Sequence, residues 1–190
     1  MIEHHPHQGP DYFYGIEGNK ILIVGNSHWL SKGEADHPDI TRHVIENVTS
    51  GKWRISFFSR IMLYFGFSNH DDFWRRVAFV NYVPGAIGID DERYNHIRSV
   101  ADVEHARERF LRIIRDLKPD FVLIFSKKIR WALPALETLP LVGGLPDAHM
   151  GLLKEDEHTA RVFLLRHPQG ARSSEMASVI QAILSHRTAA

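Results

Sequence analysis

Short apolar runs occur at four places along the chain. Each run holds four to seven residues, is rich in β-branched or aromatic side chains, and stops near a glycine, a proline or a polar residue. Runs of this kind are typical of strands buried on both faces of a parallel sheet. The pattern therefore predicts strands at residues 21–24, 77–83, 121–125 and 161–165.

The segments between these runs carry apolar residues at the three- and four-residue spacing of amphipathic helices. Such stripes fall within residues 53–65, 103–117 and 176–184, and Gly66 is expected to end the first helix. A further helix is expected to begin at Lys127 and to be disturbed by Pro134. The remaining stretches, which we expect to be loops or irregular, are residues 1–19, 31–50, 86–101 and 138–151.

Strands and helices alternate along the chain, and this order predicts an α/β fold. A mostly parallel sheet with helices on both faces is the expected architecture. No internal repeat and no boundary interrupts the pattern. We expect residues 1–190 to form a single domain, of which residues 1–19 are an irregular N-terminal segment.

Composition narrows the possible classes of protein. The absence of cysteine excludes disulfides, a thiol nucleophile and sites built on thiolates. No run approaches the length of a membrane-spanning helix, and the His-rich start does not resemble a signal peptide, so we expect a cytoplasmic protein with no membrane partner. The net charge of zero means that any binding to nucleic acid must depend on a local basic face.

Polar residues follow each predicted strand directly. The first strand is followed by residues 25–29 (GNSHW), the second ends in Asn81, and residues 126–128 (SKK) and 166–169 (RHPQ) follow the other two. Because the carboxyl ends of parallel strands meet at one edge of a sheet, these residues are expected to converge on one crevice. Each residue alone is more often structural, but an amide, a histidine and an aromatic together indicate a polar binding site.

Several common kinds of site are not indicated. The chain has no P-loop, no dinucleotide-binding glycine motif and no nucleophile elbow, so no cofactor is expected. No recurrent spacing of histidines with a carboxylate indicates a metal site. A metal site at His4, His5 and His7 stays open as an alternative, but we interpret these residues as part of a mobile tail. A small-molecule hydrolase with Ser27 as nucleophile and His167 as base stays open as a weaker alternative.

Four segments resemble motifs of the uracil-DNA glycosylase superfamily in their order and approximate spacing. They are ILIVGNSHW (21–29), VAFVNYVP (77–84), KPDFVLIFSKKIRWAL (118–133) and LLRHPQGARSS (164–174). The first segment is similar to that of a bacterial branch in which the motif reads Gly-Glu-Ser-His and then an aromatic. The resemblance spans about residues 19–186. It implies a three-layer α/β/α fold around a central four-stranded parallel sheet, with a flipped-out base held at the strand ends.

The resemblance also implies roles for individual residues. Asn26 and Ser27 occupy the positions that activate water, and Gly25, His28 and Trp29 belong to the same pocket loop. Asn81 would read the edge of the base, because its amide offers a donor and an acceptor side by side. His167 would stabilise the negative charge that develops on the base O2 as the glycosidic bond breaks.

The family stacks an aromatic side chain on the base. Trp29, Phe57 and Phe58 are candidates, although we expect the two phenylalanines to belong to the core of their helix. Contacts with the nucleic-acid backbone are expected from the start of the last helix and from basic residues at the same edge of the sheet. These candidates are Lys127, Lys128, Arg172, Ser173 and Ser174.

Two departures from the family change the expected activity. Asn26 and Ser27 replace the usual carboxylate, and an amide orients water but does not take its proton. Residues 169–172 (QGAR) replace the usual Ser-Pro-Leu wedge. We therefore expect weak hydrolysis of uracil or another deaminated base, in single-stranded or mismatched DNA. The alternative is a non-catalytic module that binds a free nucleobase or nucleotide. We expect a monomer in either case.

Overall fold

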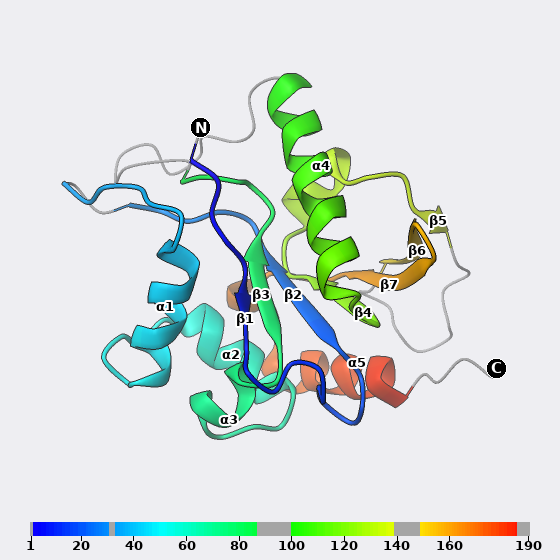
Figure 1. Cartoon of the computed structure of the whole chain (residues 1–190). Coiled ribbons are helices and arrows are strands. Elements are labelled where there is room, and N and C mark those ends of the chain that lie inside the picture. Colours follow the sequence, from blue (N-terminus) through cyan, green and yellow to red (C-terminus); the bar gives the residue numbers. More distant parts are fainter. Residues whose placement is uncertain (1, 31–32, 87–99, 139–148, 186–190) are drawn as a thin grey trace.

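The computed structural model describes residues 2–30, 33–86, 100–138 and 149–185, and in this part of the chain seven strands form one mixed sheet. The order across the sheet is β1-β3-β2-β4-β7-β6-β5. Figure 1 shows the sheet at the centre of the molecule. The strands are β1 (His7–Gln8), β2 (Ile21–Gly25), β3 (Ala78–Asn81), β4 (Phe121–Ile124), β5 (Glu137–Thr138), β6 (His149–Glu155) and β7 (His158–Leu164).

The four strands predicted from the apolar runs are β2, β3, β4 and β7, and they form the parallel centre of the sheet. The prediction of a four-stranded parallel sheet was wrong, because the sheet is mixed: β1 pairs with β3, and β6 pairs with β5 and β7, in antiparallel fashion. Residues 155–158 close a tight hairpin between β6 and β7, in which Asp156 has a φ of 52°. This turn lacks the glycine that usually marks such hairpins in a sequence.

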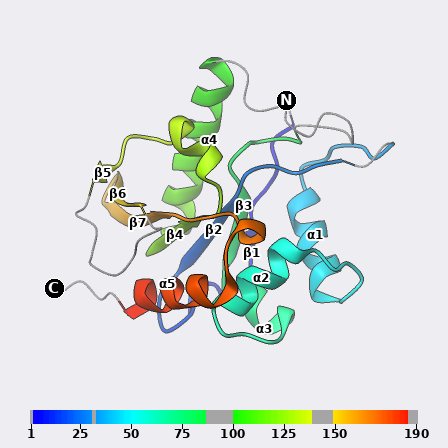
Figure 2. The same ribbon diagram turned by 180° about the vertical axis from the view of Figure 1, so that it is seen from behind.

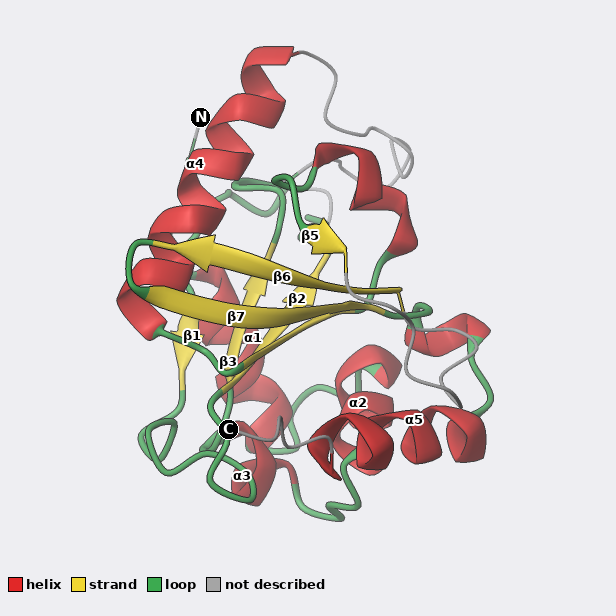
Figure 3. Cartoon of the chain, turned by 90° about the vertical axis from the view of Figure 1, so that its right-hand side faces the viewer, coloured by secondary structure: helices red, strands yellow, loops and turns green. Residues whose placement is uncertain are grey.

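Helices cover both faces of the sheet. In Figure 1 α4 lies in front of the sheet, and the reverse view in Figure 2 brings α1, α2 and α5 to the front. The side view in Figure 3 shows the sheet between these two layers. The helices are α1 (Ile40–Thr49), α2 (Ser56–Tyr64), α3 (His70–Trp74), α4 (Val100–Leu117) and α5 (Ser173–Ser185), with 3₁₀ segments η1 (Lys127–Ala132) and η2 (Pro168–Gly170).

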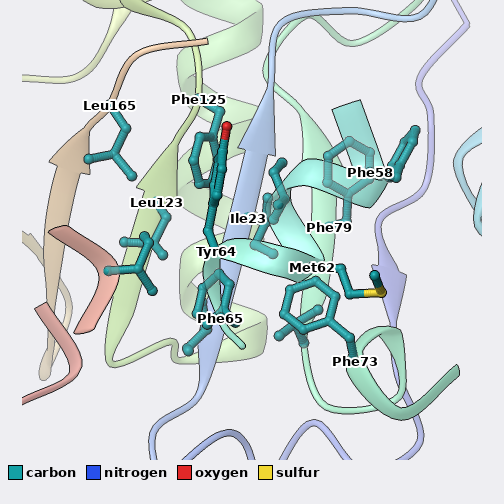
Figure 4. Close-up of a cluster of buried hydrophobic side chains, with 14 of the residues drawn as sticks. Ile23, Phe58, Met62, Tyr64, Phe65, Phe73, Phe79, Leu123, Phe125 and Leu165 are labelled. Atoms are coloured by element: carbon teal, nitrogen blue, oxygen red, sulfur yellow. The ribbon is translucent and has the colours of Figure 1, made fainter. Parts of the chain in front are cut away.

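Each face of the sheet has its own hydrophobic core, because successive side chains of a strand point to opposite faces. Ile21 and Ile23 belong to the cluster under α1, α2, α3 and α5, whereas Leu22 and Val24 belong to the cluster under α4. Figure 4 shows the first cluster, which is rich in aromatic rings. All four of these strand residues have no exposed surface, which explains why this strand reads as a continuous apolar run.

The helix predictions were right at some places and wrong at others. Gly66, at a φ of 79°, directly follows the C-cap of α2, as expected. The assignment of residues 31–50 to a loop was wrong, because α1 occupies residues 40–49 with Ile40, Val44 and Val48 buried. Part of 138–151 is strand rather than loop, and residues 139–148 lie outside the described part, as do residues 87–99 of the other predicted loop.

The N-terminal segment is an ordered part of the fold, so its interpretation as a mobile tail was wrong. The His4 side chain is 1% exposed, and β1 extends the sheet beyond β3. His4, His5 and His7 bond to three different partners, namely Asp36, Asp39 and the Trp74 carbonyl. None of the described helices combines the length and the apolar character needed to span a membrane.

Candidate functional site

A pocket of about 1300 Å³ opens at the carboxyl ends of the parallel strands. Parallel pairing of β2 with β3 and β4, and of β4 with β7, brings the four strand ends to one edge. The predicted convergence is confirmed for eight of the candidate residues. These residues, which all line the pocket, are Asn26, Ser27, His28, Trp29, Asn81, Lys127, Lys128 and His167.

Asn81 lies at the end of β3 and is held closely against Gly25. The two residues are partners in the parallel register, and Asn81 is only 5% exposed. A Cβ atom placed on Gly25 would lie 2.2 Å from Asn81 Oδ1, so any side chain at this position would displace the amide. Gly25 does not line the pocket itself. Its contribution is the space in which the Asn81 amide lies.

The loop after β2 combines buried and exposed side chains. His28 is 7% exposed, its Nε2 lies 2.9 Å from the Thr41 hydroxyl on α1, and burial lowers its pKa to about 3. His28 is therefore neutral at physiological pH. The hydroxyl oxygen of Ser27 is buried and has no hydrogen-bond partner among the described residues, whereas Trp29 is 44% exposed at the rim.

His167 presents its ring to the pocket in a defined tautomer. Its Nδ1 accepts a hydrogen bond from the Gln169 backbone N–H at 3.3 Å, so the proton of the neutral imidazole lies on Nε2. Partial desolvation lowers the pKa of His167, and the positive charge of Lys128 lowers it further. A neutral ring of this kind donates from Nε2 and has no lone pair there with which to accept a proton from Ser27. This geometry disfavours the serine hydrolase alternative.

Phe57 is the aromatic side chain that lies against His167. The two ring centroids are 5.4 Å apart, and Phe57 also contacts Phe58 and Phe79. Phe58 is 5% exposed and belongs to the core, as expected, although it also lines the pocket. Phe57 is half-buried and lines the pocket, so assigning it to the core alone was incomplete.

Basic side chains surround the pocket of this neutral chain. Lys127, Lys128 and Arg166 come from the segments after β4 and β7, and the loop between α1 and α2 adds Lys52 and Arg54 on either side of Trp53. We did not predict Lys52, Trp53 and Arg54 as pocket residues, although an aromatic residue between two basic ones is a recognisable signal of nucleic-acid binding in a sequence. Among the described lining residues one carboxylate, Glu34, accompanies these five cations. The pocket therefore favours an anionic ligand.

Other candidates lie outside the pocket. Arg172 is 84% exposed and its guanidinium lies 3.3 Å from the Glu175 carboxylate, and Ser173 and Ser174 form the start of α5. Their predicted contact with nucleic acid stays a prediction. Asp36, two residues after Glu34, is bonded to His4 and to the backbone N–H of Ala86.

Comparison with known proteins leaves the chain without an assigned family. No protein-family model matches it, and a sequence search of curated proteins gives no significant match. Within the described residues, no group of three or more histidine or acidic side chains is arranged to hold a metal ion.

Proposed function

We propose that the pocket binds a nucleobase of a single-stranded nucleic acid and hydrolyses its N-glycosidic bond, with uracil or another deaminated base as the target. One observation carries the proposal: an amide (Asn81), a donor imidazole (His167) and an aromatic ring (Phe57) come from three separate elements and line one pocket. The resemblance of the four motifs to the uracil-DNA glycosylase superfamily agrees with these roles. The basic rim suits the phosphates of the strand.

The proposed reaction assigns a distinct role to each group. Asn81 reads the O4 and N3–H of uracil, and Phe57 stacks on the ring. As the bond between C1′ and the base nitrogen breaks, its electrons leave with the base, and His167 Nε2–H donates to the O2 that becomes negative. Water adds its oxygen to C1′ and loses a proton, and the departing base gains one.

The rate of this reaction depends on the group that accepts the proton from the attacking water. In this proposal Asn26 orients a water, but an amide does not take its proton. Glu34 supplies the carboxylate of the pocket, and it is exposed at the rim rather than buried beside Asn26. We assign Glu34 as the base and expect slow turnover, because this carboxylate is exposed to solvent rather than buried beside the reacting water.

Among the described residues that line the pocket there is no buried carboxylate, and this supports a second candidate function. In this alternative the pocket binds a nucleobase or nucleotide without hydrolysing it. The buried, unpartnered hydroxyl of Ser27 then serves as a hydrogen-bonding group for the ligand. Both functions use Asn81 and Phe57, but only hydrolysis requires Glu34 and the donor proton of His167.

A strand-cleavage assay tests the enzymatic proposal. The protein is incubated with single-stranded and mismatched oligonucleotides that carry uracil, hypoxanthine or xanthine, and alkali-labile sites are then counted. We expect slow release of one base, with a loss of at least about tenfold for His167→Ala and for Glu34→Gln. The control is His105→Ala, which changes a half-exposed histidine on α4 that does not line the pocket. No cleavage at high enzyme concentration, or cleavage unaffected by His167→Ala, would exclude hydrolysis at this site.

Calorimetry tests the binding alternative. We expect uracil or a uracil-containing single strand to bind, and Asn81→Ala to weaken this binding by about tenfold through the lost hydrogen bonds. Binding without base release would favour the non-catalytic function. If neither free bases nor single strands bind, both candidate functions are excluded.

A further inference from the structure

Arg109 of α4 is a buried cation directly behind the pocket. It is 1% exposed, and one of its NH groups donates to the backbone carbonyl of Asn81 at 3.0 Å. The other donates to the backbone carbonyl of His4, and Nε lies 3.7 Å from the Glu3 carboxylate. The guanidinium thus joins the residue we assign to base reading to the N-terminal segment.

The N-terminal segment in turn contacts the segments behind both pocket loops. Figure 1 shows it (dark blue) running beside β3. The His4 backbone N–H donates to the Pro84 carbonyl at 2.8 Å, and its Nε2 lies 2.5 Å from Asp36, which also accepts from the Ala86 N–H. The His4 ring packs edge-on against His28, with 5.1 Å between centroids.

Two backbone hydrogen bonds fasten the pocket loops to each other. Tyr82 N–H donates to the Gly25 carbonyl at 3.1 Å, and Val83 N–H donates to the Asn26 carbonyl at 2.9 Å. These bonds continue the pairing of β2 with β3 past the ends of the strands. The loops that carry Asn26 and Asn81 are therefore bonded to each other, and Arg109 bonds to the Asn81 carbonyl from behind.

We propose that Arg109 is a positioning residue for the pocket. Through the carbonyls of Asn81 and His4 it fixes the N-terminal segment behind the two loops, and so sets where the Asn81 amide and the His28 ring lie. Only a guanidinium, with donors spread over a rigid plane, bonds both carbonyls at once. The nature of the ligand rests on the proposed function, whereas the positioning role does not.

Arg109→Lys tests whether the pocket needs the planar guanidinium of Arg109 or only its positive charge. Arg109→Lys keeps the cation, but its single ammonium does not span both carbonyls. We expect amide hydrogen exchange of Tyr82 and Val83, followed by NMR, to be at least about tenfold faster, and affinity for a uracil-containing single strand to be about tenfold weaker. Arg112→Lys is the matched control, because Arg112 also pairs with Glu3 but is half-exposed on the outside of α4. We expect it to change neither quantity.

A second pair of variants covers the case in which Arg109→Lys does not fold. His4→Ala removes the side chain that bonds Asp36, and we expect it to speed exchange at the same two amides. His4→Gln should restore protection, because a glutamine amide also donates to Asp36.

The positioning role is overturned if folded Arg109→Lys, or His4→Ala in its place, exchanges Tyr82 and Val83 at the wild-type rate. Failure of the proposed function has a different signature. In that case the wild-type protein binds no base or single strand at all, while faster exchange in the variants still supports the role of Arg109.

Discussion

The two walls of the pocket are built in different ways. The segments at the ends of β2 and β3, residues 25–29 and 81–86, supply the lining residues Asn26, Ser27, His28, Trp29 and Asn81 on one side of the pocket. Buried groups hold these two segments from behind, and we call this side the braced wall. Residues 126–128 and 166–170, after β4 and β7, form a wall with exposed basic side chains and an exposed histidine, which we call the charged wall. This contrast indicates that the two walls have different roles in binding. We expect the braced wall to select the base by shape and the charged wall to hold phosphates.

We expect the largest loss of affinity from a steric clash in the braced wall. Gly25→Ala would place a Cβ 2.2 Å from Asn81 Oδ1 and 3.3 Å from the Phe79 ring, and this would displace the amide. We expect affinity for a uracil-containing strand to fall about hundredfold, because small misplacements of recognition groups are costly. Gly170→Ala in the charged wall is the control, since a Cβ there meets no atom within 4 Å. Equal losses in the two variants would contradict the division between the walls.

The next largest expected effect is a loss of stability at acidic pH, and His28 is its source. The folded pKa of His28 is about 3, whereas an unfolded histidine titrates near 6.5. Between these values the unfolded chain binds a proton that the folded chain does not, so stability falls as the pH falls through this window. At pH 5 the cost is roughly 2 kcal/mol.

Chemical unfolding at pH 7 and pH 5 measures this cost. We expect His28→Asn to lose clearly less stability between the two pH values than the wild-type protein does. His167→Asn in the charged wall should change the pH dependence less, because the His167 ring is more exposed, although its pKa is lowered too. A wild-type slope retained in His28→Asn would show that His28 is not the titrating group.

An intermediate effect is expected where α2 meets the charged wall. Phe57 and Phe58 are neighbours, but Phe57 packs on His167 while Phe58 packs on Trp74 in the core. We expect Phe57→Leu to reduce affinity about tenfold, as for a lost base–aromatic stack, with little change in stability. Phe58→Leu should do the reverse, with a loss of about 1–2 kcal/mol in the free energy of unfolding. Binding titrations and chemical unfolding of both variants measure the difference.

The parallel centre of the sheet and most of the pocket were visible in the sequence, because both depend on local patterns. Consecutive apolar residues such as Ile21–Val24 indicate a buried strand. Residues that directly follow parallel strands lie at the same edge of the sheet. We did not predict α1, because polar residues outnumber apolar ones in its sequence. Two of these polar residues, Thr41 and Asn47, are nevertheless buried, where each forms a hydrogen bond.

The bracing behind the pocket was not predicted, because it consists of contacts between distant parts of the chain. Arg109 lies 105 residues from His4 and 28 from Asn81 along the chain. One local signal existed: Arg109 falls between Ala106 and Ile113 at the spacing of the buried stripe of α4. A charged residue in such a position must find buried partners, but the sequence does not say which ones.

The smallest expected effect belongs to a single charge of the charged wall. If Lys128 meets a phosphate, Lys128→Gln should weaken binding of a single strand by about fourfold at about 0.15 M salt and lower the slope of log affinity against log salt by about 0.7. Lys20→Gln is the control, because Lys20 precedes β2 at the opposite end of the sheet and makes the same change in net charge. Fluorescence titrations over a range of salt concentrations measure both slopes. Identical slopes for Lys128→Gln and Lys20→Gln would mean that the charged wall attracts nucleic acid no more than the rest of the surface does.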